Sequence, residues 1–322
     1  MRAVRIDEPG GPEVLKLVEV PTSEPGAHDL LVEVAASGVN YLDVYQRTGA
    51  YRGPLPFVPG MEGSGRVRAV GSAVTGFAPG DRVAWPQSAG SYAEQIVLPA
   101  DRVVAVPDDL DDERAATLLQ GMTAHYLLHD SFPVAPGDTV LVHAAAGGMG
   151  LLLTRWATAL GARVIGTVST AVKEELAREA GAAEVIRYSD VDFAPEVRRL
   201  TDGTGVAAVY DGVGATTFDG SLASLRTRGT MVIYGAASGP VPPFDVQRLN
   251  SGGSLLLTRP SLVHFINTRE ELARRGAEVF AAIGSGALAV RIGGRYPLAE
   301  AARAHQDLEA RRTTGKLLLL PN

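Results

Sequence analysis

The hydrophobic pattern of this chain changes near Asp111. Before that point, short runs in which apolar and polar residues alternate are divided by clusters of glycine and proline. Such alternation is typical of half-buried strands, and such clusters are typical of the turns between them. The runs lie at residues 3–6, 15–20, 30–36, 65–70, 82–84, 93–97 and 103–106. We therefore expect the first part of the chain to form a compact, β-rich and partly open barrel.

Strands and helices alternate after Asp111. A helical stretch covers residues 111–130, and apolar strands are then expected at 139–143, 163–167, 183–187, 206–210, 230–234 and 254–258. Helices are expected at residues 150–160, 171–180, 193–201, 216–226 and 245–250. This alternation predicts an α/β domain with a doubly wound parallel sheet in the strand order 3-2-1-4-5-6.

The last part of the chain departs from that alternation. A helix is expected at residues 269–284, and the apolar strand 316–320 has no obvious partner in a completed parallel sheet. We therefore assign the C-terminal residues 261–322 to the same domain as the β-rich first part of the chain. The predicted domains are residues 1–118 with 261–322, and residues 119–260.

The turn after the first strand of the doubly wound domain reads AAAGGMG, residues 144–150. A strand, a glycine-rich turn, a helix and a second strand at this spacing are what a dinucleotide phosphate site requires. Gly147 and Gly148 carry no Cβ and allow bare backbone to approach a pyrophosphate at the helix N-terminus. Gly150 allows the helix to pack closely on the sheet. Ala145 stands where the first glycine of G-x-G-x-x-G would be, so a packing turn without a ligand is the alternative.

The residues after the second strand indicate which dinucleotide binds. An NAD site usually has Asp or Glu at the end of this strand, where it holds the ribose 2′-hydroxyl. Here Ser169 and Lys173 follow the strand, and the first acidic residue is Glu174. A hydroxyl and an ammonium can hold a 2′-phosphate that a carboxylate would repel. We therefore expect NADPH as the cofactor, although Lys173 equally fits a solvated place on the next helix.

Composition and charge exclude several other classes of protein. The chain has 322 residues, a net charge of −6 and no cysteine. We therefore expect neither nucleic acid nor an anionic membrane as partner, no disulfide and no thiol catalysis. The charged N-terminus does not resemble a signal peptide and no run of 18 apolar residues occurs, so a cytoplasmic protein is expected. His125 and His129 lie one helical turn apart, but without a third ligand nearby they are not expected to bind a metal.

Further motifs occur in order along essentially the whole chain. Residues 40–51 are similar to N-x-x-D-x-Y-x-R-x-G-x-Y, residues 58–65 resemble a P-G-x-E-x-x-G turn, and residues 120–124 resemble a G-x-T-A helix start. With the AAAGGMG turn and residues 258–262 and 295–298, they resemble the zinc-independent NADPH:quinone oxidoreductases (zeta-crystallin-like) of the medium-chain dehydrogenase/reductase superfamily. The resemblance implies a GroES-like barrel domain, a Rossmann domain, and hydride transfer from NADPH to a quinone in the cleft between them.

Two departures from the zinc alcohol dehydrogenases of that superfamily fit an enzyme without zinc. Met61 stands beside Glu62 where those enzymes have a histidine ligand, and the chain has no cysteine. A short connection at residues 85–90 replaces their four-cysteine lobe. Without a Lewis acid an alcohol is hard to oxidise, so a ready hydride acceptor such as a quinone or an enone is favoured.

The resemblance also implies the catalytic residues, Tyr51, Tyr45, Asn40 and Arg47. Tyr45 would pack on or hydrogen-bond the cofactor, and Asn40 would contact its ribose or amide. Asp43 and Arg47 would either pair on a helix and fix that segment, or contact the substrate directly. Tyr51 would either donate a proton to an enolate, as the matching tyrosine does in enoyl-thioester reductases, or lie as an amphipathic residue at a rim.

The implied cofactor contacts lie mainly at the carboxyl ends of the parallel strands, where open α/β sheets bind ligands. Tyr188 and Arg311 would lie near the adenosine phosphate with Lys173, although Arg311 also fits a solvated pair with Arg312. The full set is Asn40, Tyr45, Thr123, Ala146, Gly147, Gly148, Met149, Ser169, Lys173, Tyr188, Gly212, Tyr234, Gly235 and Arg311.

Three functions are compatible with the sequence. The leading interpretation is an NADPH-dependent reductase of a small-molecule quinone. An enone or enoyl-thioester reductase is the alternative, although the scattered arginines offer no basic groove for an acyl carrier. The third is a non-enzymatic NADPH-binding protein. The sequence gives neither the physiological substrate nor the number of electrons transferred. By analogy with relatives, a homodimer is expected through the sixth Rossmann strand, because residues 254–257 would be a hazardous free edge.

Overall fold

The computed structural model describes residues 1–51 and 53–321, which form two compact units. The first unit contains Met1–Met122, Ile266–Ser285 and the residues from Val290 onward. The second contains Thr123–Phe265 and Gly286–Ala289. The sequence predicted domain boundaries after residues 118 and 260, and the chain passes between the two units a few residues later, after Met122 and Phe265.

The second unit is built on a six-stranded parallel sheet. Its strands are β8 (Thr139–Val142), β9 (Arg163–Val168), β10 (Glu184–Arg187), β11 (Val206–Asp211), β12 (Leu225–Ile233) and β13 (Leu256–Thr258). Their order is β10-β9-β8-β11-β12-β13, which confirms the predicted order 3-2-1-4-5-6. The first strand of the unit is therefore central, and the carboxyl ends of β8, β9 and β11 lie next to one another.

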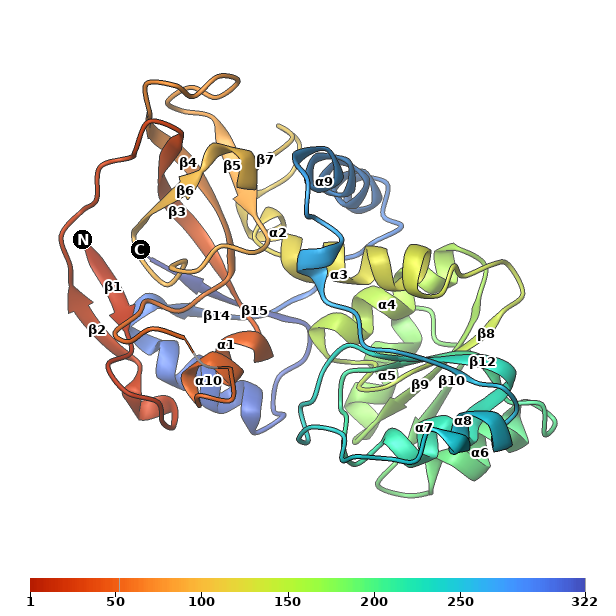
Figure 1. Cartoon of the computed structure of the whole chain (residues 1–322). Helices are drawn as coiled ribbons and strands as arrows, with labels where there is room; N and C mark the ends of the chain where they lie inside the picture. The colour runs from red at the N-terminus through yellow and green to blue at the C-terminus, as the bar shows by residue number, and fades with distance from the viewer. Residues whose placement is uncertain (52, 322) are drawn as a thin grey trace. The chain divides into compact units, whose positions relative to one another are not determined.

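Helices cover both faces of this sheet (Figure 1). Helices α4 (Gly148–Ala159) and α5 (Ala171–Glu179) lie on one face, and α6 (Phe193–Leu200) and α7 (Phe218–Ser224) lie on the other. The short helix α8 (Gln247–Ser251) precedes β13. Buried apolar side chains from the strands and from α6 and α7, such as Leu141, Val197 and Phe218, form one core cluster.

Strand β12 begins earlier than the sequence predicts. The expected helix 216–226 ends at Ser224, and Leu225 already pairs with Val206. The register shifts before the next pair, Ala208 with Thr230. Residues 226–229 therefore lie inside the strand as an irregularity. Within it, Arg228 has a φ of +60°. Tertiary pairing overrides the local sequence preference here.

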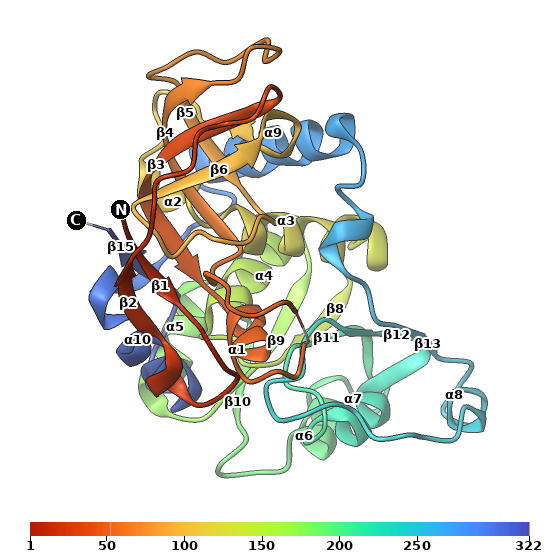
Figure 2. The ribbon, with the colours of Figure 1, turned by 60° about the vertical axis from the view of Figure 1, so that its left-hand side comes forward.

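The first unit contains a mixed, mainly antiparallel sheet (Figure 2). Its strands are β3 (Asp29–Val39), β4 (Glu62–Val70), β5 (Arg82–Trp85), β6 (Gln95–Pro99), β7 (Val104–Ala105), β14 (Ile292–Pro297) and β15 (Lys316–Leu320). The order is β14-β15-β3-β4-β5-β7, and β6 also pairs with β3. Long β3 is therefore the centre of the sheet. Strands β1 (Arg2–Arg5) and β2 (Lys16–Glu19) form a separate antiparallel pair.

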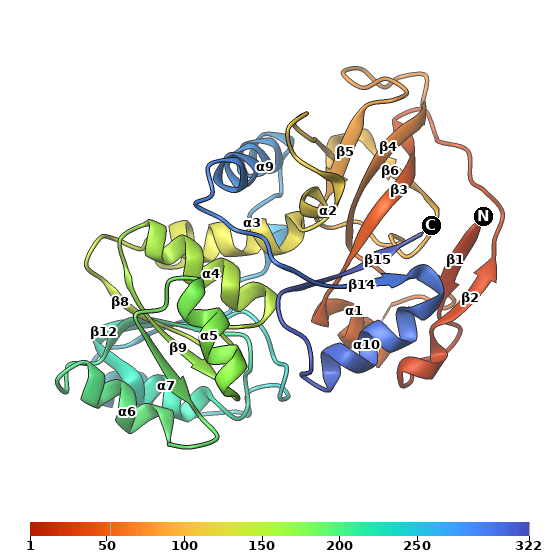
Figure 3. The ribbon, with the colours of Figure 1, turned by 180° about the vertical axis from the view of Figure 1, so that it is seen from behind.

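The C-terminal strand has the predicted bounds, and its partners lie in the first unit. Leu317 pairs with Val39 of β3, and β14 pairs with the other edge of β15. These pairings make the C-terminal strand part of the sheet of the first unit. The sequence analysis assigned no element to β14 or to helix α10 (Ala301–Glu309), which lies beside both strands (Figure 3).

The remaining helices connect or cover these sheets. Helix α9 begins and ends at the predicted residues, because a capping box of Thr268 and Glu271 fixes its start. No helix of the described residues is long and apolar enough to cross a bilayer. The bounds are α1 (Tyr41–Arg47), α2 (Asp112–Ala115), α3 (Leu118–Tyr126), a π-helical turn (Leu127–Ser131), α9 (Arg269–Gly284), and 3₁₀ turns at Pro12–Val14, Ala100–Arg102, Leu262–His264 and Leu298–Glu300.

Candidate functional site

The glycine-rich turn joins β8 to the N-terminus of α4, as the sequence predicts. Gly147 is the N-cap of α4, and its N–H donates to the carbonyl of Ala144 over 2.8 Å. A Cβ added to Gly147 would meet only that carbonyl, at 3.2 Å, so the surrounding space is open. A Cβ on Gly150 would lie 2.1 Å from the same carbonyl, which excludes any larger residue there. The turn therefore presents bare backbone at a helix N-terminus, which suits a phosphate.

Two predicted phosphate contacts adjoin this turn. Ala146 is buried in it, and Met149 is half-buried in the first turn of α4. Ala145 donates its N–H to the carbonyl of Thr167 in β9 over 3.0 Å. The turn is thereby fixed to the neighbouring strand.

The segments that follow β9 and β10 contain three of the four residues expected at the adenosine phosphate, and the fourth, Arg311, follows α10. Lys173 lies in the first turn of α5, which Thr170 caps. Tyr188 follows β10, is 44% exposed, and donates its N–H to Val168 over 3.1 Å. Ser169 accepts a 3.1 Å hydrogen bond on its carbonyl from the hydroxyl of Ser189. Neighbouring parallel strands thus place these side chains at one edge of the sheet.

The first acidic residue after β9 is held by arginines. Glu174 forms ion pairs with Arg178 at 3.0 Å and with Arg187 at 3.4 Å. These pairs offset its charge near the end of β9. A group with a negative charge, such as a 2′-phosphate, is therefore not opposed there by a bare carboxylate.

The loops after β11 and β12 pack closely on each other. A Cβ on Gly212 would lie 2.7–2.9 Å from ring atoms of Tyr234. A Cβ on Gly235 would lie 2.6 Å from the carbonyl of Gly212. The absence of side chains at both glycines therefore allows the Tyr234 ring to lie against the loop after β11.

A buried network that the sequence analysis did not foresee ties the ends of β8, β9 and β11 together. The imidazole of His143 lies 2.9 Å from the hydroxyl of Thr167 through Nδ1 and 2.9 Å from that of Ser221 through Nε2. Asp211 accepts hydrogen bonds from the hydroxyls of Ser221 at 3.0 Å and Thr217 at 2.7 Å. Since Ser221 donates its hydroxyl proton to Asp211, its oxygen is left to accept from Nε2 of His143, and burial lowers the pKa of that imidazole. This chain braces the loops in which the expected cofactor contacts lie.

In the first unit, Tyr45 and Tyr51 lie against each other. Their ring centroids are 5.3 Å apart and tilted by 52°, and the N–H of Tyr51 donates to the carbonyl of Tyr45 over 2.9 Å. Tyr51 is 47% exposed, whereas Tyr45 on α1 is half-buried. Tyr41 continues the aromatic group, with its ring 6.1 Å from that of Tyr45. Helix α1 and the residues after it therefore form an aromatic group in which Tyr51 is the most exposed member.

The expected pairing of Asp43 with Arg47 is wrong. Arg47 is 1% exposed and forms a bidentate ion pair with Glu309, with both nitrogen–oxygen distances 2.8 Å. Its Nε also donates to the carbonyl of Gly10 over 3.1 Å. Burial and these contacts give Arg47 the structural role that the sequence left open, and direct contact with substrate is not supported.

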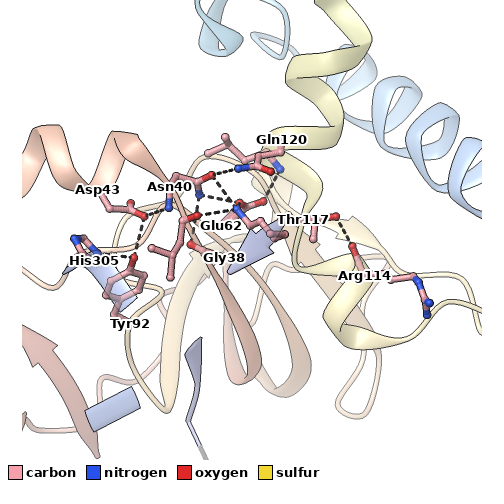
Figure 4. A network of polar contacts seen from close by, with 12 residues as sticks. Gly38, Asn40, Asp43, Glu62, Tyr92, Arg114, Thr117, Gln120 and His305 are labelled. Atoms are coloured by element: carbon pink, nitrogen blue, oxygen red, sulfur yellow. Dashed lines mark hydrogen bonds and ion pairs between the residues drawn. The ribbon is translucent and has the colours of Figure 1, made fainter. Parts of the chain in front are cut away.

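Asp43 ends a directed chain of hydrogen bonds that starts at Arg47. Arg47 donates to Nδ1 of His305 over 3.2 Å, so the ring proton lies on Nε2, which faces the hydroxyl of Tyr92 at 3.1 Å. That hydroxyl donates to Asp43 over 3.0 Å (Figure 4). Burial raises the pKa of Asp43 to about 7 and that of Tyr92 well above its usual value. Burial and the Arg47 charge lower the pKa of His305 to about 3.

Asn40 lies in a second buried cluster and is 5% exposed. Its Nδ2 donates to Glu62 over 2.8 Å, and its Oδ1 accepts from Gln120 over 3.0 Å and from Lys316 over 2.9 Å (Figure 4). Both ends of the carboxamide are thus engaged within the unit. Glu62 and Gln120 fall in motifs of the sequence, but nothing in the sequence pointed to Lys316.

Two further expected residues lie on α3 and shortly after α10. Thr123 is on α3 and is 9% exposed. Arg311 follows α10 with a φ of +57°, and its charge opposes the rise that burial causes in the pKa of Tyr41. Arg311 therefore lies near α1 within the first unit.

The described residues 1–51 and 53–321 contain no group of three or more His, Cys, Asp or Glu side chains that could hold a metal ion. His125 and His129 are 4.6 Å apart, and both pack edge-on against Trp156 at 5.5 and 5.4 Å. They form an aromatic cluster with that ring.

Comparisons with known proteins match both parts of the chain. Residues 26–108 match the family model of the alcohol dehydrogenase GroES-like domain, and residues 148–281 match that of zinc-binding dehydrogenases. A quinone oxidoreductase of Pseudomonas aeruginosa is 46% identical, with 97% of each chain covered. A 2-haloacrylate reductase of Burkholderia is 43% identical, with 99% of this chain and 98% of that protein covered.

A solved structure agrees with these matches. Escherichia coli quinone oxidoreductase complexed with NADPH has a TM-score of 0.97 to this chain, at 42% identity and with all of both chains covered. The GroES-like and Rossmann architecture expected from the sequence is thereby confirmed. The chain belongs to the quinone oxidoreductase family of the medium-chain dehydrogenase/reductase superfamily.

Proposed function

We propose that this protein is an NADPH-dependent reductase of small-molecule quinones that works without zinc. The observation that carries the proposal is the bare-backbone turn at the N-terminus of α4, flanked by Ser169, Lys173 and Tyr188. This arrangement fits a dinucleotide with a 2′-phosphate, because it combines open amide groups with a cation and hydroxyls. The NADPH found in the Escherichia coli relative supports the choice.

Each group of residues would hold a different part of NADPH. The turn Ala146–Met149 would bind the pyrophosphate, and Lys173 with Tyr188 would bind the 2′-phosphate end. Arg311 would be a further partner of the adenosine phosphate. Gly212 would border the two riboses, and Tyr234 and Gly235 would lie by the nicotinamide, with Thr123 and Tyr45 as further contacts. When bound, NADPH supplies a hydride at its nicotinamide ring.

The first unit would supply the substrate side. The Tyr45–Tyr51 pair offers flat aromatic surface to a quinone ring, and Tyr51 is its more exposed member. A quinone that accepts a hydride becomes a stabilised aromatic anion, which takes its proton from water. The protein then contributes alignment and little acid–base catalysis. Asn40 and Arg47, whose polar groups are engaged internally, would act through the position of α1.

A second candidate function is reduction of a conjugated enone, enoyl thioester or haloacrylate. The 43% identical 2-haloacrylate reductase favours it, and so does the exposed phenol of Tyr51. An enolate must be protonated at carbon, where a positioned phenol is useful.

The loss of NADPH absorbance separates these functions. Turnover with a naphthoquinone, and little with 2-chloroacrylate, an enone or an enoyl thioester, supports the quinone reductase. The reverse preference supports the second candidate, and saturable NADPH binding without any turnover supports a non-enzymatic role. Detection of a semiquinone radical during turnover indicates one-electron transfer, and its absence with a stoichiometric hydroquinone product indicates two.

We also propose a homodimer formed through the edge of β13. Leu256 on this strand is 58% exposed, and Val246 and Val263 nearby in sequence are 62% and 45% exposed. An edge strand with apolar side chains is a template for pairing with a second copy. Leu256→Lys, measured by light scattering, is expected to shift the mass from dimer to monomer.

A further inference from the structure

Lys316 is a buried cation whose hydrogen-bonding capacity is fully used. Its ammonium donates to the carbonyl of Val39 over 3.1 Å, to Oδ1 of Asn40 over 2.9 Å and to Oε1 of Glu62. The side chain is 2% exposed and that of Glu62 is 0% exposed. An ammonium group has three donors, and here three oxygens from β3, its following residue and β4 accept them.

The cage around this ammonium fixes the direction of the Asn40 carboxamide. The amide oxygen faces Lys316, and the amide nitrogen faces Glu62 at 2.8 Å. A carboxamide has two similar orientations, which differ only by exchange of its oxygen and nitrogen. A cation at one end and a carboxylate at the other select one of them.

Asn40 in turn determines where α1 begins. It is the N-cap of that helix, where its N–H donates to Oδ2 of Asp43 over 2.8 Å and its main-chain carbonyl accepts from the N–H of Asp43 over 3.1 Å. Glu62 also accepts from the N–H of Leu119 over 2.7 Å, at the start of α3. The ammonium cage therefore joins β15, β3, β4 and α3 at the point from which α1 carries the Tyr45–Tyr51 pair.

A charge pair of this kind is not required for stability alone. Burying two charges costs about as much as their attraction returns, and well-packed neutral residues often replace such pairs without loss. Neutral Gln120 also donates to Oδ1 of Asn40 over 3.0 Å, but a hydrogen bond from a neutral amide holds one carboxamide orientation more weakly than a hydrogen bond from an ammonium does. The charge therefore points to a role in geometry and not in the free energy of folding.

We propose that Lys316 is a positioning residue, an internal cation that orients Asn40 and so sets the placement of α1 and its aromatic pair for hydride transfer. The proposal rests on the proposed reductase function. Removal of the ammonium is expected to impair the reaction through alignment, while the NADPH-binding turn on the second unit is unaffected.

The first test is chemical rescue of Lys316→Ala. We expect kcat/KM for a naphthoquinone to fall roughly 10- to 100-fold, as a small misplacement of reacting groups does. The NADPH dissociation constant is expected to change less than kcat/KM does, because most of the proposed cofactor contacts lie on the second unit and Tyr45 alone lies on α1. Ethylammonium or propylammonium should restore kcat/KM with saturation and raise the thermal midpoint, whereas tetramethylammonium and K⁺ should do neither. Lys16→Ala, at an exposed lysine of β2, is the matched control that responds to no amine.

The second test uses the neutral pair Lys316→Met with Glu62→Gln, which keeps the volume and leaves no lone buried charge. We expect this double variant to retain the wild-type thermal midpoint within a few degrees. Its kcat/KM for a naphthoquinone is expected to stay below that of the wild type, as in Lys316→Ala. It also serves where Lys316→Ala does not fold. Wild-type kcat/KM in the folded double variant would overturn the proposal, as would full activity of Lys316→Ala without amine. Failure of the wild type to reduce any quinone would refute the reductase function instead, and the amine-dependent thermal midpoint would still report on the cage.

Discussion

Replacement of Asp43 by asparagine is expected to change how the stability of the first unit depends on pH. The carboxyl group is completely buried, and its Oδ1 accepts no hydrogen bond from the described residues. Burial raises its pKa from 3.8 to about 7, against the N–H of Asn40, the hydroxyl of Tyr92 and the charge of Lys316, which lower it. The nearby charge of Glu62 adds to the rise.

The sign and size of the effect follow from that shift. Because the folded-state pKa is raised, the native protein binds the Asp43 proton more tightly than the unfolded chain does. The resulting stability is complete below pH 3.8 and is lost as the pH rises to about 7. At about 1.36 kcal/mol per pKa unit, the free energy of unfolding of Asp43→Asn should gain on the wild type by up to about 4 kcal/mol between pH 4 and pH 7.

His305 provides a control of opposite sign. Burial and Arg47 lower its pKa to about 3. The stability that the neutral ring contributes to the folded protein is therefore present above pH 6.5 and is lost as the pH falls. Glutamine at position 305 can accept from Arg47 and donate to Tyr92 as the neutral ring does. The free energy of unfolding of His305→Gln should therefore rise relative to that of the wild type as the pH is lowered from 6.5, by up to about 1.4 kcal/mol per pH unit.

Urea unfolding between pH 4.5 and 8 measures these differences. The chain has two tryptophans, so a Trp156→Phe background leaves buried Trp85 as the fluorescent reporter of the first unit. The difference between Asp43→Asn and its parent should rise with pH. A difference that is flat or falls with pH would refute the assignment of a raised pKa to this carboxyl group.

Further predictions concern the cofactor, the metal and the phenol. NADPH should bind at least roughly 1.4 kcal/mol more tightly than NADH, a tenfold ratio, and Lys173→Ala should weaken NADPH alone in fluorescence titrations; equal loss for both would exclude contact with the 2′-phosphate. Dialysis against a strong chelator should leave quinone reduction and the thermal midpoint unaltered, whereas a stoichiometric zinc whose removal abolishes activity would contradict the zinc-free reaction. Tyr51→Phe should change kcat on quinones only a few-fold, but by roughly 10²- to 10⁴-fold on an enoyl substrate if Tyr51 protonates the enolate.

The parallel sheet could be predicted because its strands are continuous apolar runs with helices at regular spacing. Residues close together in the sequence were enough to predict β8, the AAAGGMG turn and α9, whose start is marked by a capping box. The local sequence was not enough at residues 225–229, which the sequence analysis divided between the end of the helix 216–226 and the connection to the strand 230–234. There the pairing of β12 with β11 decides the structure.

The polar networks could not be predicted, because their members are distant in sequence. Lys316 and Glu62 are separated by 254 residues, and Arg47 and Glu309 by 262. The local spacing of Asp43 and Arg47 suggested a helical ion pair, but both side chains are buried and have partners from other elements. The spacing of two residues shows whether they are neighbours on one helix, but not which other elements pack against that helix.

The topology of the first unit has a consequence for synthesis on the ribosome. The second unit lies almost entirely within one continuous stretch, residues 123–265, whereas the first needs both ends of the chain. Until β15 emerges, the residues at the end of β3 lack one strand partner and the carboxylate of Glu62 lacks its ammonium. The part of the protein that is translated first is therefore completed last. A nascent chain arrested before residue 316 would hold a finished Rossmann unit beside an open sheet edge, which is the stage at which a chaperone or a second copy of the chain has most to bind.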